Sequence, residues 1–262
     1  MDTAGVTIFR IDFNIDPASL WDQNDADGRK GITENKYCQG YLKLMRDIKK
    51  RYGCFMDSCA SGGGRNDLES MRRGVPLLRS DNDRTTASLR LSMTTSFNRW
   101  IPFCGANTKE KKEQLALRGI SDPYVWRASY LPSLNVDSQF TQDLDQDFDI
   151  LRFGLNEWKR INRYLLKEFY VLTPWHSEQE RDSFTAYSFF DPESETGVLL
   201  AFRGEDCGQS EVSLCLPFTQ GKDYILTDAD SGKTITTKDE FDLYFECPRQ
   251  ARLLFVKRKN QI

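Results

Sequence analysis

The sequence VTIFRID (Val6–Asp12) is a short, mostly apolar segment that ends in an aspartate. Such a segment is typical of a buried parallel strand whose last residue reaches the carboxyl edge of its sheet. An amphipathic helix is predicted next, over Glu34–Arg51, because apolar residues recur there every three or four positions. A second strand is predicted at Cys54–Asp57. The order strand, helix, strand indicates a parallel α/β sheet.

The same alternation continues toward the middle of the chain. Further strands are predicted at Val75–Ser80, Ile101–Ala106 and Leu131–Val136, and further helical segments at Thr85–Trp100, Tyr124–Tyr130 and Leu144–Leu165. Repeated βα units with polar residues at the carboxyl ends of the strands favour a (β/α)8 barrel. A complete barrel takes roughly 250 residues, whereas the barrel-like part ends near residue 175. The expected fold is therefore α/β, the C-terminal half of a (β/α)8 barrel.

The sequence changes character after Pro174, where short β-branched and aromatic segments alternate with turns. The strands predicted there are Thr185–Phe190, Gly197–Arg203, Glu211–Pro217, Asp223–Asp228, Phe241–Glu246 and Ala251–Arg258. We therefore predict two domains. Residues 1–175 form a partial (β/α)8 catalytic domain with about strands four to eight, and residues 183–262 form a small antiparallel β-sandwich.

The composition excludes several classes of function. The 262 residues are 39% hydrophobic, which is enough for a buried core. The charges nearly balance, at a formal net charge of -3, so no basic field attracts nucleic acid or anionic lipid. Neither an apolar stretch of about eighteen residues nor a signal-peptide pattern occurs. We expect a soluble cytoplasmic protein that binds neither nucleic acid nor membranes.

Cysteine and histidine usage restricts the chemistry further. The seven cysteines form no CxxC pair and are read as reduced thiols, and His176 is the only histidine. Zinc sites and Ser-His-Asp or Cys-His catalysis depend on imidazole. The acidic segment Asp22–Gly28 does not match the EF-hand pattern. Catalysis is therefore expected to use carboxylates, without a metal or cofactor.

Three short segments contain the candidate reactive residues. Arg10, Asp12 and Asn14 lie at the end of the first predicted strand. The loop Cys59–Asp67 (CASGGGRND) has three consecutive glycines, which allow a ligand to approach the backbone closely. A phosphate-binding P-loop would have Gly-Lys-Ser/Thr where this loop has Gly-Arg-Asn. Asp81 follows another predicted strand.

Two carboxylates from separate strands at one end of a barrel are what glycoside hydrolysis requires. In a retaining enzyme they lie about 5 to 5.5 Å apart, where one attacks the anomeric carbon and the other protonates the leaving oxygen. Arg10 would keep Asp12 ionised, whereas burial would raise the pKa of the acid. Asp83 is an alternative to Asp81 as that acid. A single strand-end aspartate, in contrast, more often caps a helix or turn.

Together and in this order, the three segments resemble glycoside hydrolase family 36, the α-galactosidase and raffinose-synthase-related group. Arg10–Asn14 (RIDFN) is similar to the family's Lys-Trp-Asp-x-Asn motif. Cys59–Asp67 is similar to its Cys-Ser-Gly-Gly-Gly-Gly-Arg-Phe-Asp loop, and Ser80–Asn82 to its Ser-Asp-Asn motif. The resemblance extends to Tyr224–Lys233 in the predicted sandwich. It implies a retaining hydrolase that releases terminal α-linked galactose through a covalent glycosyl-aspartate intermediate.

By this resemblance Asp12 is the nucleophile and Asp81 the acid/base. The substrate-binding residues that it implies are Arg10, Asn14, Cys59, Ser61, Gly62, Arg65 and Asp67. The implied substrate is an α-galactoside oligosaccharide or glycoconjugate. The missing N-terminal part of the parent chain is the expected partner, and a homo-oligomer is compatible with the sequence. The isolated chain is expected to have little or no activity, because its pocket is open.

The sequence departs from the family pattern at several positions. Arg10 replaces a lysine, Ala60-Ser61 replaces Ser-Gly, and Leu78 stands where the family often has tryptophan. The Ala60-Ser61 change leaves an α-N-acetylgalactosaminidase as an alternative. A transglycosylase and a truncated, non-catalytic carbohydrate-binding remnant are further alternatives. Trp21 and Trp126 are the aromatic residues expected at the rim of the sugar site.

Overall fold

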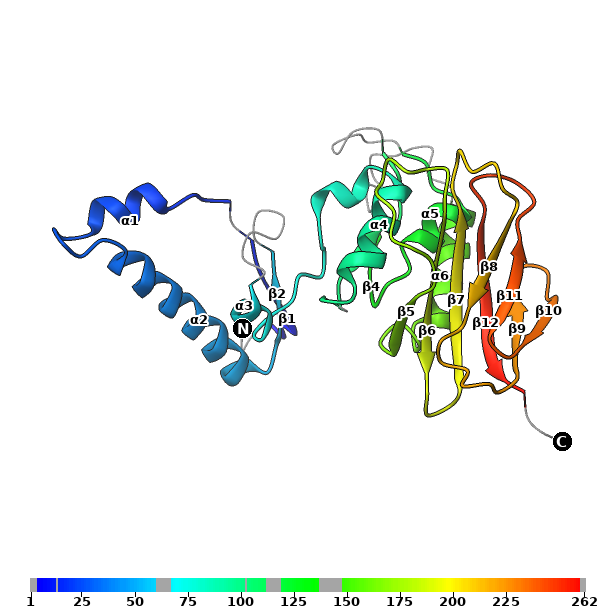
Figure 1. The fold of residues 1–262 in the computed structure, drawn as a ribbon. Coiled ribbons are helices and arrows are strands. Elements are labelled where there is room, and N and C mark those ends of the chain that lie inside the picture. The colour runs from blue at the N-terminus through cyan, green and yellow to red at the C-terminus, as the bar shows by residue number, and fades with distance from the viewer. Residues whose placement is uncertain are drawn as a thin grey trace. The chain divides into compact units, whose positions relative to one another are not determined.

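The computed structural model describes residues 4–12, 14–59, 67–101, 103–111, 119–136 and 148–259. The chain divides into two compact units, Met1–Ser80 and Asp81–Ile262, both of which contain helices and strands (Figure 1). Within these described ranges, no helix has both the length and the hydrophobicity that crossing a membrane requires.

The first unit is built around two parallel strands and one long helix. Its elements are β1 (Ile8–Ile11), α1 (Ala18–Asn24), α2 (Ile32–Tyr52), β2 (Phe55–Ser58) and α3 (Leu68–Met71). β1 and β2 pair in a parallel register that places Arg10 opposite Asp57. The long helix α2 confirms the amphipathic helix predicted over Glu34–Arg51. Its buried Met45 packs with Met56 of β2. The helix is capped at its C-terminal end by Gly53, whose φ of 64° is a left-handed conformation that glycine adopts readily.

The strand predicted at Val75–Ser80 is wrong. Val75 forms a single parallel bridge to Asp57 and Leu78 is another isolated bridge residue, but no continuous strand runs through this segment. The reason is that the Asp57 carboxylate, through Oδ1, accepts the backbone N–H of Leu77 at 2.9 Å. A side chain thus takes the donor that would otherwise continue the strand ladder.

The second unit begins with short helices and one parallel strand pair. These elements are η1 (Asp81–Arg84), α4 (Ala87–Phe97), β3 (Gly105–Asn107), α5 (Pro123–Ala128), β4 (Ser133–Asn135) and α6 (Phe148–Ile161). β3 and β4 pair in parallel. The helices α4 and α5 lie where the sequence predicts them, whereas β3 starts later than expected. The described residues contain two separate two-stranded parallel sheets, so the half-barrel stays a prediction.

An antiparallel β-sandwich forms the rest of the second unit, as the sequence predicts. Its strands are β5 (Glu168–Val171), β6 (Phe184–Asp191), β7 (Thr196–Arg203), β8 (Glu211–Cys215), β9 (Tyr224–Asp228), β10 (Thr234–Thr237), β11 (Glu240–Tyr244) and β12 (Ala251–Arg258). The larger sheet has the order β10-β9-β12-β7-β6-β5, and β11 pairs with β8 in a second sheet. The sequence did not predict β5 and β10. β5 also lies before residue 175, the predicted end of the first domain, and that domain division stays a prediction.

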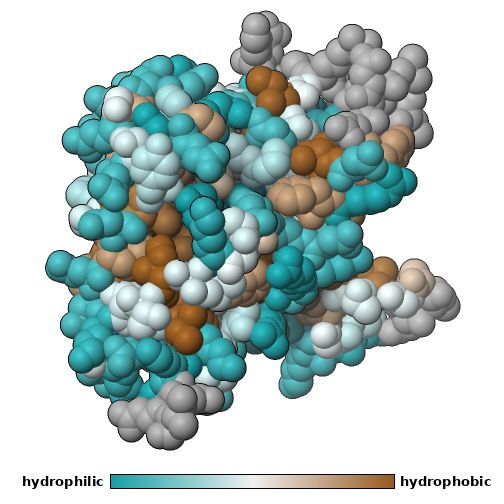
Figure 2. Space-filling model, turned by 90° about the vertical axis from the view of Figure 1, so that its right-hand side faces the viewer, coloured by the Kyte–Doolittle hydropathy of each residue, from teal (hydrophilic) through white to brown (hydrophobic). Residues whose placement is uncertain are grey.

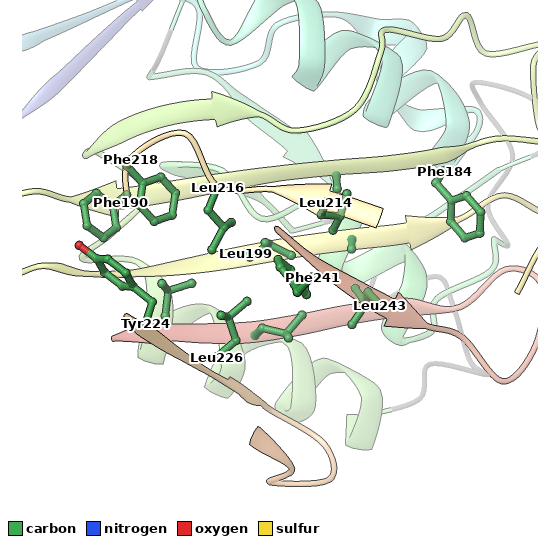
Figure 3. Close-up of a cluster of buried hydrophobic side chains, with 14 of the residues drawn as sticks. Phe184, Phe190, Leu199, Leu214, Leu216, Phe218, Tyr224, Leu226, Phe241 and Leu243 are labelled. Carbon is green, nitrogen blue, oxygen red and sulfur yellow. The ribbon is translucent and has the colours of Figure 1, made fainter. Parts of the chain in front are cut away.

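The core of the sandwich is formed by apolar side chains from both sheets. Leu199 and Leu226 of the larger sheet and Leu214 and Leu243 of the smaller one are almost fully buried (Figure 3). At one end of this core Phe190 stacks on another phenylalanine, with ring centroids 4.0 Å apart. Some apolar residues remain at the surface, and Figure 2 shows them as patches between polar residues.

A buried arginine joins the helices of the second unit to its sandwich. Arg127 of α5 donates from Nε and Nη2 to both carboxylate oxygens of Glu157 in α6, at 3.0 and 2.8 Å. It also donates to both oxygens of Asp230, at 2.8 and 2.6 Å, and to the carbonyl of Ala251 in β12. Burial alone would lower the pKa of Arg127, but the hydrogen bonds that it donates to Asp230 and Glu157 raise it. The guanidinium therefore stays charged and connects three elements.

A second close contact holds α6 against α5. A Cβ placed on Gly154 would lie 2.0 Å from Cδ2 of Trp126. Alanine in a helix normally stabilises by about 0.5–1 kcal/mol relative to glycine. We expect Gly154→Ala to destabilise the protein instead, by about 1–3 kcal/mol, because the indole has to move.

Denaturant unfolding tests this expectation. Gly40→Ala in α2 is the matched control, because no atom lies within 4 Å of its added Cβ. The control should gain stability while Gly154→Ala loses it. Equal gains in both variants would contradict the packing described for α6.

Candidate functional site

Asp12 lies directly after the last residue of β1 and is held by Arg10. The guanidinium of Arg10 donates from Nη2 to Asp12 Oδ2 at 3.2 Å and from Nη1 to Asp57 Oδ2 at 2.6 Å. The Asp12 side chain is 44% exposed, whereas that of Asp57 is 6% exposed. Partial burial alone would lower the pKa of Arg10, but Asp57, Cys59 and Asp12 together raise it. Arg10 therefore stays positive beside an accessible carboxylate.

Asp57 belongs to this site although its local sequence does not indicate it. It is the last residue of the strand predicted at Cys54–Asp57, and it lies opposite Arg10 in the parallel register. Its two oxygens accept from Arg10 and from the backbone of Leu77. Asp57 thereby fixes the guanidinium from the buried side. A carboxylate in a buried strand was a signal that something had to neutralise it.

Cys59 and a hollow lined partly by aromatic residues also lie next to Asp12. The N–H of Cys59 donates to the carbonyl of Ile11 at 3.0 Å, at the end of the parallel ladder and next to Asp12. A hollow of about 620 Å³ adjoins this strand end. Its lining is formed by Phe9, Arg10, Ile11, Asp12, Tyr37, Gly40, Tyr41 and Leu44. The carboxylate of Asp12 thus borders a space wide enough for a small ligand.

The predicted rim tryptophans have different positions. Trp21 packs on Tyr37 in the first unit, with ring centroids 5.1 Å apart, and so lies close to the hollow. Trp126 is wrong as a rim residue, because it is 1% exposed and donates from Nε1 to Ser121 Oγ at 3.0 Å. Its ring belongs to the packing between α5 and α6.

The other predicted substrate-binding residues are only partly described. Asn14 is exposed just beyond β1. Asp67 caps α3, where Oδ1 accepts from the backbones of Glu69 and Ser70 at 2.9 and 3.0 Å. Burial would raise the pKa of Asp67, but the hydrogen bonds from Ser70 and Glu69 lower it. Ser61, Gly62 and Arg65 lie outside the described residues. The substrate roles of all these residues stay predictions.

Asp81 is the first residue of η1 and the first residue of the second unit. Its side chain is exposed and accepts no hydrogen bond from the described residues. The backbone carbonyl of Asn82 accepts from Thr85, which fixes the turn into α4. Asp12 belongs to the first unit, so the pairing of its carboxylate with that of Asp81 stays a prediction. The side chain of the alternative acid, Asp83, lies outside the described part.

Among the described residues, no cluster of three or more His, Cys, Asp or Glu side chains is arranged to hold a metal ion. Placed beside Arg10, Asp12 can act as a nucleophile or as an electrostatic stabiliser. An ionised carboxylate at the edge of a hollow can attack, or stabilise, an electron-poor carbon.

No protein-family model and no curated protein sequence matches the chain. Solved structures do match it. The family 36 α-galactosidase AgaB from Geobacillus stearothermophilus is 17% identical, with a TM-score of 0.73 over 98% of this chain and 36% of that chain. An α-galactosidase from Lactobacillus brevis is 15% identical, with a TM-score of 0.73 over 92% and 34%. AgaA from Geobacillus stearothermophilus, in complex with raffinose, is 17% identical, with a TM-score of 0.70 over 90% and 33%.

The chain therefore spans about a third of the length of the structures it matches. Its fold is that of a portion of the family 36 α-galactosidases, with the large antiparallel sheet matching their C-terminal β-sandwich. The resemblance predicted from the sequence is confirmed at the level of the fold, and the coverage is consistent with a C-terminal portion.

Proposed function

We propose, from the family 36 fold of this chain and from the carboxylate at the end of β1, that it is the C-terminal portion of a retaining α-galactosidase. The enzyme releases terminal α-linked galactose by double displacement, without a metal or cofactor. The observation that supports this most directly is the Arg10 guanidinium, bonded to Asp12 and to the buried Asp57. It presents one ionised carboxylate to a hollow at a strand end.

Asp12 is the nucleophile in this proposal. The positive charge of Arg10 stabilises the ionised carboxylate, which is the form that attacks carbon. Because Asp57 holds the other guanidinium nitrogen, Arg10 keeps its place when a ligand enters. One oxygen of Asp12 forms a bond to the anomeric carbon while the glycosidic bond breaks, which produces a galactosyl ester.

Asp81 is the proposed acid/base. In the first step it gives its proton to the departing glycosidic oxygen. In the second step it takes a proton from water, whose oxygen attacks the anomeric carbon and releases Asp12. Asp83 is the neighbouring carboxyl that would take this role if Asp81 does not. The step requires the second unit to bring η1 to the strand end that carries Asp12.

We propose α-galactoside oligosaccharides as substrates, because AgaA has been crystallised with raffinose and with stachyose. We also propose that a longer parent chain supplies the first half of the barrel. Among the described residues β1 pairs only with β2, so its other edge is open to a preceding strand.

The fragment proposal has a direct test. The DNA upstream of Met1 is read in frame, and hydrolysis of nitrophenyl α-galactoside is measured for this chain and for the extended chain. The extended chain should be active and this chain nearly inactive. Comparable turnover by this chain alone would contradict the proposal.

Replacing Asp81 by alanine in the extended chain tests its role as the acid. We expect kcat/KM for raffinose to fall by roughly 10²–10⁴-fold, because its leaving sugar needs a proton. The loss for nitrophenyl α-galactoside should be much smaller, since nitrophenolate leaves unprotonated. Asp83→Ala is the matched control and should change the two substrates equally little. An equal loss on both substrates in Asp81→Ala would refute the assignment.

A further inference from the structure

The β-sandwich contains a second hollow, wholly within the second unit. Its volume is about 420 Å³, within the roughly 300–1,000 Å³ typical of ligand sites. Its lining comes from the end of β9, the β9–β10 turn, β10, β11, the segment that leads into β12 and the first half of β12. Leu243 and Leu254 lie behind it and are 1% and 0% exposed, so the accessible residues of its lining are mainly polar. We call this hollow the sandwich groove.

Arg252 is the less exposed of the two cationic side chains that line the sandwich groove. Its side chain is 18% exposed and donates from Nε to Asp228 Oδ2 at 2.7 Å. Its Nη1 donates to the backbone carbonyl of Tyr244 at 2.6 Å. Within the described residues its Nη2 donates to no acceptor. The guanidinium is thus fixed at two nitrogens and can donate to a ligand from the third.

Other polar groups of the groove also have hydrogen-bonding capacity left. In the part of the chain that the structure describes, the side chains of Glu246 and Lys233 have no hydrogen-bond partner. Gln250 uses Oε1 to accept the N–H of Glu246 at 2.7 Å, so its amide nitrogen can still donate. Tyr244 is 54% exposed and offers both a ring and a hydroxyl. Free donors, a free acceptor and an aromatic ring therefore line one hollow.

The charge of the lining restricts the ligand. The described lining has four carboxylates, Asp228, Asp230, Asp242 and Glu246, against two cations, Lys233 and Arg252. Asp230 is also paired with Arg127, so the carboxylates outnumber these three cations by one. An anionic ligand is disfavoured by this net negative charge. A molecule with many hydroxyl groups fits better, because each hydroxyl both donates and accepts. Its C–H face can pack on the exposed ring of Tyr244.

We infer that the sandwich groove is a binding site for a neutral oligosaccharide. The site adds a non-catalytic contact with sugar to the proposed hydrolysis and does not depend on that hydrolysis taking place. Arg252 and Glu246 bind hydroxyl groups as donor and acceptor, and Tyr244 packs against a ring.

Raffinose is the probe for the test, with citrate as the anionic comparison. The ¹⁵N-labelled chain is titrated with each, and the shifts of the backbone amides are followed. Raffinose should shift amides within residues 228–235 and 242–252. Glu246→Gln and Tyr244→Ala should each weaken its binding roughly tenfold, equivalent to about 1.4 kcal/mol. Tyr244→Phe should retain most of the affinity, because it keeps the ring.

Glu240→Gln is the matched control, since Glu240 is exposed on the same strand, β11, but does not line the groove. It should leave raffinose binding unchanged. Unchanged groove amides, binding that is insensitive to Tyr244→Ala and Glu246→Gln, or citrate bound in preference to raffinose would overturn the inference. Shifts confined to the amides around Asp12 would also overturn it, while supporting the proposed function.

Discussion

Replacing Asp12 by asparagine is expected to abolish hydrolysis of nitrophenyl α-galactoside by the extended chain. The amide has nearly the same shape but cannot form the galactosyl ester, so kcat should fall at least ~10⁴-fold. The contact with Arg10 at 3.2 Å can be kept by the amide oxygen, so the fold should be unaffected. Asp16→Asn is the matched control, because Asp16 is an exposed aspartate of the same loop. Near-normal turnover in Asp12→Asn would exclude a nucleophilic role.

Chemical rescue separates a missing nucleophile from a damaged site. Asp12→Gly leaves room for azide, which can attack the anomeric carbon as nitrophenolate departs. Turnover should return with added azide, and the product should be the β-galactosyl azide. Loss of activity in both variants without rescue would instead indicate a structural role for Asp12.

The largest expected effect on stability is that of Arg127→Ala. The substitution leaves the Glu157 carboxylate, whose side chain is 6% exposed, without its cation. Removing one partner of a buried ion pair typically costs about 3–5 kcal/mol of unfolding free energy. The change also removes the links to Asp230 and to β12. Denaturant unfolding followed by circular dichroism measures the loss.

Arg152→Ala is the matched control for Arg127→Ala. Its partner is Asp149, and the two side chains are 70% and 92% exposed. Exposed pairs of this kind contribute about 0–1 kcal/mol. Adding Glu157→Gln to Arg127→Ala should recover part of the loss, because the uncompensated charge is removed. If Arg127→Ala were as mild as Arg152→Ala, the buried network would not join the helices to the sandwich.

Long periodic segments were the most predictable part of the fold. The amphipathic repeat predicted α2, and short apolar segments bounded by turn residues predicted β7 and β12 to within a residue. β10, with the sequence TITT, was missed because it carries little apolar signal. The strand expected at Val75–Ser80 does not form because of a tertiary contact. The backbone N–H of Leu77 donates to the side chain of Asp57 instead of to a neighbouring strand.

The candidate site was predictable only where its residues are close in sequence. Arg10 and Asp12 are two positions apart, so an extended chain places them on the same face. Asp57 was missed because its pairing with Arg10 depends on the register between two strands. The burial of Trp126 likewise depends on Gly154 of α6, which a local pattern around the tryptophan does not show.

Trapping of the intermediate tests the central claim most directly. The extended chain is treated with a 2-deoxy-2-fluorogalactosyl fluoride, digested with trypsin and analysed by fragmenting mass spectrometry. The fluorine slows hydrolysis of the ester, so the label should accumulate on Asp12 within the peptide Ile11–Arg29. A label on Asp57, Asp81 or any other residue, or continued turnover with no label at all, would contradict the account.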